Sequence, residues 1–156
     1  MIWFDIKQLE KQFVDGDISD KEGFNYLLAN MVMFSLTPYL AGDRYQNYWL
    51  TFIQFVVDIF ITVILIRATF DINTTGDNRD YFKRFLGLSF VTAIRLIVYI
   101  IIFLIPTTII MYFVEKSGTV DKNSKNIFML LLSIATAIVY YFMLTNSFRR
   151  VNEKRL

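Results

Sequence analysis

The chain of 156 residues contains no cysteine and no histidine. Without cysteine it can form no disulfide, no thiolate nucleophile and no cysteine-ligated metal site. Without histidine it lacks the commonest metal ligand and the commonest general base near neutral pH. It also lacks the glycine-rich motifs that bind phosphates. We therefore expect no catalytic residues, no cofactor and no metal, and the sequence predicts that the protein is not an enzyme.

An enzyme built only on carboxylates is the remaining catalytic alternative. Its one candidate cluster is Asp71, Asp77 and Asp80 beside Arg79. These residues follow a turn signal and precede an apolar helix, where Asp is typical of helix capping. We therefore interpret the cluster as the start of a helix.

Charge is also scarce in this chain. Charged residues make up 19%, against about 25% in typical soluble proteins. Hydrophobic residues make up 55%, and the mean hydropathy is +0.44. The net charge of +2 gives no reason to expect nucleic-acid binding. The composition indicates a protein whose partner is a lipid bilayer.

Four apolar segments are candidates for membrane-spanning helices, which need about 20 mostly apolar residues. They are residues 24–40, 48–66, 86–114 and 127–145. The sequence thus predicts an all-α membrane protein in which residues 1–156 form a single domain with four transmembrane helices. The third segment would be about 43 Å long as a helix, against a hydrocarbon thickness of about 30 Å. We expect this long third helix to extend into the cytoplasm.

The distribution of basic residues predicts the orientation. Eleven of the 16 lysines and arginines lie in the N-terminal tail, the loop after the second span and the C-terminal tail, and 4 lie in the two other loops. Cytoplasmic loops are enriched in Lys and Arg. We therefore expect a multi-pass protein of the plasma (inner) membrane with both termini in the cytoplasm. Residues 1–22 and the basic residues 146–156 would be its cytoplasmic tails.

The N-terminal tail contains a candidate amphipathic helix over residues 3–14. Apolar residues favour one face and polar residues the other: Trp3, Phe4, Ile6, Leu9 and Phe13 against Lys7, Gln8, Lys11 and Gln12. Such a helix either lies in the inner leaflet or packs on other parts of the protein. Gly16 is a predicted C-cap, and Ser19 with Glu22 forms a predicted capping box that starts the next helix.

Asp58 is the one acid well inside a predicted span, and a charge at that depth is a functional candidate by default. Other candidates for the same intramembrane polar site are Arg95, Asn30, Thr62, Thr107 and Thr136. Arg95 is expected at the inner interface, too far from Asp58 for a simple ion pair. Two interpretations stay open for Asp58: a polar contact that holds helices together, or an ion or proton pathway.

Five basic residues are candidate contacts for anionic lipid or for a cytoplasmic protein partner. They are Arg79, Lys83, Arg84, Arg149 and Arg150. Closely spaced small residues, Ser89 with Ala93 and Ser133 with Ala137, predict close helix packing within one chain or between copies.

Two functions fit these features. The first is a non-enzymatic, bacterial-type inner-membrane protein that homo-oligomerises and couples to a cytoplasmic partner. Small four-span proteins of this shape occur as membrane components of antiviral defence and toxin systems, so this role is one hypothesis. The second is an oligomeric channel or small transporter with Asp58 in its pathway.

Overall fold

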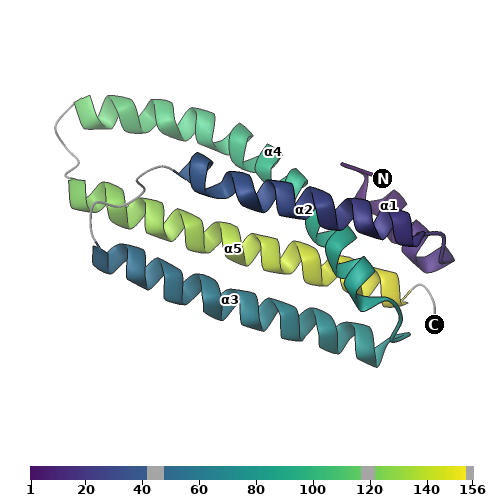
Figure 1. The fold of residues 1–156 in the computed structure, drawn as a ribbon. Helices are drawn as coiled ribbons and strands as arrows, with labels where there is room; N and C mark the ends of the chain where they lie inside the picture. The colour runs from purple at the N-terminus through teal and green to yellow at the C-terminus, as the bar shows by residue number, and fades with distance from the viewer. Residues whose placement is uncertain (42–47, 117–121, 154–156) are drawn as a thin grey trace.

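The computed structural model describes residues 1–41, 48–116 and 122–153, and these residues form helices and turns without any strand. Five helices follow one another: α1 (Ile6–Asp15), α2 (Asp20–Ala41), α3 (Tyr48–Thr75), α4 (Tyr81–Lys116) and α5 (Lys122–Glu153). Figure 1 shows the four longer helices side by side, with α1 at the end that carries both chain termini. The predicted all-α class is confirmed.

Among the residues that the structure describes, three helices are long and apolar enough to cross a membrane. They are Tyr48–Thr75, Tyr81–Thr107 and Asn126–Glu153. A membrane protein is therefore supported. The first predicted span, residues 24–40, lies within α2, which is not among these three helices. Asn25 and Asn30 interrupt its apolar sequence.

The helices extend further than the predicted spans. Helix α3 continues to Thr75 and α5 continues to Glu153, whereas the apolar runs were expected to end at residues 66 and 145. Residues 146–153 of the predicted basic tail are thus helical. Hydropathy marks only the apolar part of a helix, and it does not detect a polar continuation that is stabilised by packing.

The helices form an open arrangement. Helix α5 packs along α3 and also on α4, α4 packs on α2, and α1 lies against α4 and α5. Within the residues that the structure describes, α2 packs on neither α3 nor α5. Gln54 of α3 bonds to Ser133 of α5 near one end, and Ile72 bonds to Asn152 near the other. These two bonds show that α3 and α5 run in the same direction in nearly constant register.

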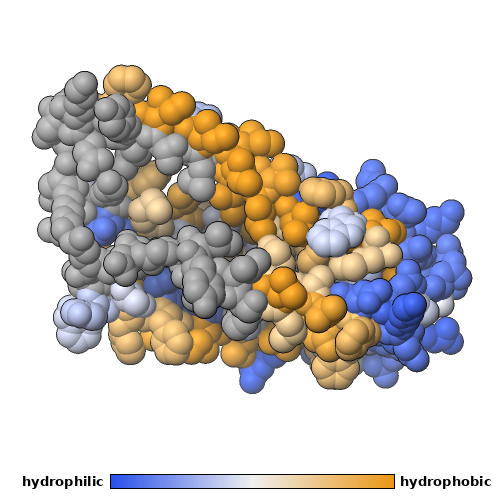
Figure 2. Space-filling view, turned by 45° about the horizontal axis from the view of Figure 1, so that its top comes forward, coloured by the Kyte–Doolittle hydropathy of each residue, from blue (hydrophilic) through white to orange (hydrophobic). Residues whose placement is uncertain are grey.

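Almost all buried apolar side chains lie toward one end of the molecule, which we call the packed end. They come from α1, α2, α3, the first part of α4 and the last part of α5: Ile6, Leu9, Phe13, Tyr26, Leu65, Leu88, Phe90, Val91, Leu144, Phe148 and Val151. In Figure 2 this end carries the hydrophilic surface at the right, and most of the surface beside it is hydrophobic.

The opposite part of the molecule, which we call the apolar half, consists of residues 48–64, 97–107 and 126–142. Most of its large side chains are exposed, including Phe52, Phe60, Phe103 and Phe142. Exposed apolar side chains at this density are typical of a surface that faces lipid. The long α4 therefore has two environments, one buried under α1, α2 and α5 and one on the surface.

Local signals at the packed end agree with the sequence. Gly16 adopts a left-handed conformation with φ of 80° and ends α1. The Glu22 amide donates to the Ser19 hydroxyl over 3.3 Å, and the Ser19 amide donates to the Glu22 carboxylate over 3.2 Å. The predicted C-cap and capping box are both confirmed.

The first helix is shorter than predicted, and its buried face contains Glu10 beside the predicted Ile6, Leu9 and Phe13. It begins at Ile6, because the Asp5 side chain accepts a hydrogen bond from the Gln8 amide and caps it. Trp3 and Phe4 precede the helix and are exposed. Trp3 still contacts the Phe90 ring of α4 at a centroid distance of 5.2 Å.

Candidate functional site

Asp58 lies on the side of α3 that faces α5. Its carboxylate accepts a hydrogen bond of 2.6 Å from the Gln54 amide group. The Gln54 carbonyl oxygen in turn accepts a bond of 2.6 Å from the Ser133 hydroxyl of α5. That hydroxyl also lies 2.7 Å from the Leu130 carbonyl, so its single proton serves one acceptor at a time. Asp58 thus orients Gln54, and Gln54 connects two helices.

This polar chain borders a groove of about 730 Å³ between α3, α4 and α5. Asp58, Gln54, Ser133 and Thr136 supply polar groups, and most of the remaining lining is apolar. The Thr136 hydroxyl donates to the Leu132 carbonyl of its own helix over 2.9 Å. Two predicted site residues, Asp58 and Thr136, therefore meet in one groove.

The remaining predicted members of the polar site lie elsewhere. Arg95 donates to the Tyr99 hydroxyl over 3.3 Å, and Tyr99 lines the groove, so Arg95 lies next to it. Asn30 connects α2 to α4 by donating to the Leu86 carbonyl over 3.0 Å. Thr107 donates to the carbonyl of Phe103 within α4.

Thr62 is exposed on α3 and does not line this groove. No ion pair between Asp58 and Arg95 is found in the part of the chain that the structure describes. The sequence thus predicted one polar layer, whereas the structure distributes its residues over separate helix contacts. Gln54 was not predicted, although its position four residues before Asp58 places both on one helix face.

A second polar network lies at the packed end, where α3 turns into α4. The Arg84 guanidinium forms two bonds to Asp77, of 2.5 and 2.6 Å. It also donates to the side-chain oxygens of Asn73 and Asn152, each over 3.0 Å. Only 2% of the Arg84 side chain is exposed. This arginine therefore joins the ends of three helices and cannot contact a soluble partner.

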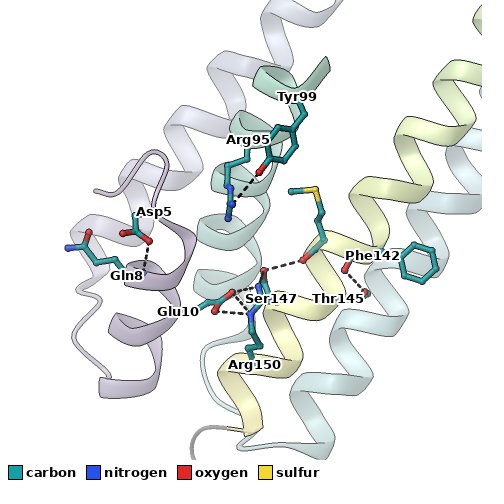
Figure 3. A network of polar contacts seen from close by, with 10 residues as sticks. Asp5, Gln8, Glu10, Arg95, Tyr99, Phe142, Thr145, Ser147 and Arg150 are labelled. Atoms are coloured by element: carbon teal, nitrogen blue, oxygen red, sulfur yellow. Dashed lines mark hydrogen bonds and ion pairs between the residues drawn. The ribbon is translucent and has the colours of Figure 1, made fainter. Parts of the chain in front are cut away.

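A third polar contact attaches α1 to the bundle (Figure 3). The Glu10 side chain is completely buried and accepts bonds from Arg150 of α5, the shortest of 2.6 Å. Arg150 also donates to the Ser147 hydroxyl over 2.9 Å. Glu10 lies four residues after Ile6 and next to Leu9, and residues four apart share one face of a helix. Glu10 therefore belongs to the buried face of α1. An acid within an apolar helix face was the sequence signal for this contact.

These contacts change the interpretation of the basic residues. Arg84 and Arg150 pair with Asp77 and Glu10, and Lys83 pairs with Asp20 at 2.5 Å. Arg79 and Arg149 are exposed at the same end of the molecule. Of the five candidate contacts for lipid or partner, three therefore form ion pairs within the chain.

The carboxylates of Asp20 and Glu22, both in the first turn of α2, have lowered pKa values, which favours their charged form. The hydrogen bond and the charge of Lys83 lower the pKa of Asp20. The backbone amide of Ser19 is the main cause that lowers the pKa of Glu22. Both groups are therefore ionised at neutral pH and retain charge under mildly acidic conditions.

Within residues 1–41, 48–116 and 122–153, no three acidic side chains gather in a group that could hold a metal ion. The arrangement offers hydrogen bonding and helix attachment, and the described polar side chains contact mainly one another or the backbone. No protein-family model matches the chain, and neither a curated protein nor a solved structure is similar to it.

Proposed function

We propose that the protein is a non-enzymatic component of a bacterial-type inner membrane that homo-oligomerises and couples to a cytoplasmic partner. The observation that carries the proposal is the division of the molecule into a packed, polar end and an apolar half. The apolar half suits the lipid bilayer and contacts between helices of different copies. The packed end holds both termini and the segment between α3 and α4, and its visible surface is hydrophilic (Figure 2).

The path of the chain supports four spans with both termini on one side. The chain starts at the packed end with α1, and α3 starts at the opposite end (Figure 1). Helix α2 has 22 residues, or about 33 Å, which exceeds the hydrocarbon thickness of about 30 Å, and it runs from the packed end toward the end where α3 starts (Figure 1). If α3, α4 and α5 cross a bilayer, α2 therefore crosses it too. The excess of Lys and Arg then places the packed end in the cytoplasm.

Self-association is proposed through the apolar half. Within one chain, only 6% of the most apolar part of α3 is buried, and the same share of α5. In a bilayer, helix association depends on close van der Waals packing and on polar contacts. Ser89 is buried inside the chain and its carbonyl accepts a bond from Tyr140. This small-residue face therefore already packs against α5 within one copy. An outward face that is exposed in one copy, such as that of Phe55, is more available for contact with a second copy.

Cysteine crosslinking in native membranes tests this proposal. Phe55→Cys places a thiol on the outer face of α3, where the native side chain is exposed, and it is expected to form a crosslinked dimer. Leu65→Cys is the matched control on the same helix, because Leu65 is buried, and it is expected to stay monomeric. A monomeric mass in detergent and in lipid nanodiscs, without any Phe55→Cys crosslink, would contradict self-association.

The cytoplasmic partner is proposed to contact the packed end at its exposed bases. Arg79 and Arg149 are the candidates that carry no internal ion pair within the described part of the chain. A membrane component of a defence or toxin system would use such a surface to recruit a soluble effector. Photocrosslinking in cells from position 78, which is exposed next to Arg79, tests the surface. Loss of one discrete adduct in the Arg79→Glu, Arg149→Glu variant is expected, and an unchanged adduct would contradict the proposal.

A channel or small transporter is the second candidate, and the position of Asp58 at a partly polar groove favours it. Conductance in planar bilayers tests it. The Asp58→Asn variant keeps an acceptor for Gln54, so it is expected to fold in either case. A conductance that depends on Asp58 would favour the channel, whereas the absence of conductance in the wild-type oligomer would reject it.

A further inference from the structure

The groove beside Asp58 is a laterally open space in the apolar half. On α4 it is lined by Tyr99, Ile100 and Phe103, and on α5 by residues such as Leu132 and Tyr140. Its volume of about 730 Å³ is within the range of about 300–1,000 Å³ that is usual for ligand sites. A surface in the bilayer that is mostly apolar and open to the side is accessible to lipid.

Arg95 supplies a positive charge next to this groove. It is half-buried in an apolar helix that is able to cross the membrane. Its hydrogen bond goes to Tyr99, and it has no acidic partner among the described residues. Arg84, Arg150 and Lys83 each have one. In Figure 3 the Arg95 side chain points along α4 toward the end where Arg150 and Glu10 lie. An arginine in this position is expected to bind an anionic group near the membrane–water interface.

The length of the groove matches one leaflet. Eleven residue steps separate Met129 from Tyr140, the limits of the lining on α5. At the helical rise these steps span about 16 Å. This is about half of the hydrocarbon thickness of about 30 Å. The groove is therefore long enough to accommodate an acyl chain over about the depth of one leaflet.

We propose that the groove binds one acyl chain of an anionic phospholipid, whose phosphate contacts the Arg95 guanidinium. The planar guanidinium matches phosphate oxygens in a bidentate geometry. The Tyr99 hydroxyl, already bonded to Arg95, lies at the same level as a second donor. A headgroup with net charge −1 neutralises the unpaired cation, which a zwitterionic headgroup does not.

A second copy of the chain fits this site less well than a lipid. It would need an acid at the level of Arg95, and the candidate acid in the apolar half is Asp58, which is engaged by Gln54. A lipid supplies its own phosphate at that level, so it requires no acidic side chain from the protein. It also leaves the outward face of α3 available for self-association.

Native mass spectrometry of the purified full chain tests the lipid site. The probes are phosphatidylglycerol and phosphatidylcholine with identical acyl chains. The wild type is expected to retain one phosphatidylglycerol and to release phosphatidylcholine. Arg95→Gln is expected to weaken retention about tenfold, the effect of losing one charge-assisted contact. Arg149→Gln is the control, since it removes an exposed charge of the same kind at the packed end.

Two further variants keep the test decisive. Ala137→Phe fills the groove with Arg95 intact and is expected to abolish retention. Arg95→Lys keeps the charge without the bidentate geometry, and it is expected to show intermediate retention of phosphatidylglycerol. This variant can still be measured if Arg95→Gln fails to fold. Equal retention of the two lipids, or unchanged retention in Arg95→Gln, would overturn the proposal. An altered oligomeric mass in Ala137→Phe with unchanged lipid retention would also overturn it, because a second copy would then fill the groove.

Discussion

The packed end and the apolar half of this protein share helices α3, α4 and α5 but are stabilised in different ways. At the packed end, α1, α2, α4 and α5 bury apolar side chains around the polar contacts of Arg84 and Glu10. In the apolar half, most large side chains are exposed, and the polar contact between helices that we identify there is the Gln54–Ser133 bond. The difference shows that one end is stabilised mainly by the chain itself, whereas the other depends on its surroundings.

Removing the Arg84 side chain is expected to have the largest effect. Arg84→Ala leaves the Asp77 carboxylate and the side-chain oxygens of Asn73 and Asn152 without this donor. Breaking a buried ion pair in this way costs about 3–5 kcal/mol. Denaturant unfolding in detergent micelles measures the free energy of unfolding. Arg79→Ala is the control, because Arg79 is exposed, and a similar loss in both variants would refute the special role of Arg84.

The next prediction compares one substitution at two positions of α5. Leu144 is completely buried at the packed end, and 59% of Leu131 is exposed in the apolar half. Leu144→Ala is expected to cost about 2–5 kcal/mol because it leaves a cavity. Leu131→Ala is expected to stay within about 0.5 kcal/mol. The same unfolding measurement in detergent compares them, and equal costs would remove the distinction between the two regions.

The attachment of α1 is expected to depend on Glu10 to a smaller extent. Glu10→Ala removes the buried acceptor of Arg150, at a cost of about 1–3 kcal/mol. The value is expected at the low end, because 45% of the Arg150 side chain is exposed and solvent screens it. Hydrogen exchange of the α1 amides measures the release of the helix. Lys11→Ala, an exposed change on the same helix, is the control.

The charge exchange Glu10→Arg with Arg150→Glu sharpens this test. It restores opposite charges between α1 and α5 and is expected to recover part of the lost protection. Slow exchange of α1 in the Glu10→Ala variant would show that Ile6, Leu9 and Phe13 alone hold the helix.

The smallest expected effect is a pH dependence at the start of α2. The pKa values of Asp20 and Glu22 are lowered by folding, so their contribution is complete above the unfolded values of 3.8 and 4.5. It is lost as the pH falls through the lower folded values. Hydrogen exchange of the first turn of α2 is expected to accelerate between pH 5 and pH 3, relative to the intrinsic rate. Glu22→Gln removes one titrating group, and an unchanged pH dependence in this variant would contradict its contribution.

Local signals in the sequence predicted several parts of the fold. The left-handed Gly16 and the Ser19–Glu22 capping box were predictable because each depends on residues a few positions apart. The positions of α3, α4 and α5 were predictable because an apolar run longer than 18 residues has few other stable environments. The polar ends of α3 and α5 were not, because Asn73 and Asn152 are helical through contacts with Arg84 from another helix.

The amino-acid sequence by itself determined the all-α class, the apolar segments and the absence of cysteine and histidine. These properties depend on composition and on local spacing, which do not change when the chain folds. The tertiary structure decided which polar groups meet. It assigned Glu10 to Arg150 and Arg84 to Asp77, and it placed Arg95 next to the groove, bonded to Tyr99 and, among the described residues, without an ion pair. Such pairings depend on how the helices cross and on where they separate, and packing between residues far apart in the chain sets both.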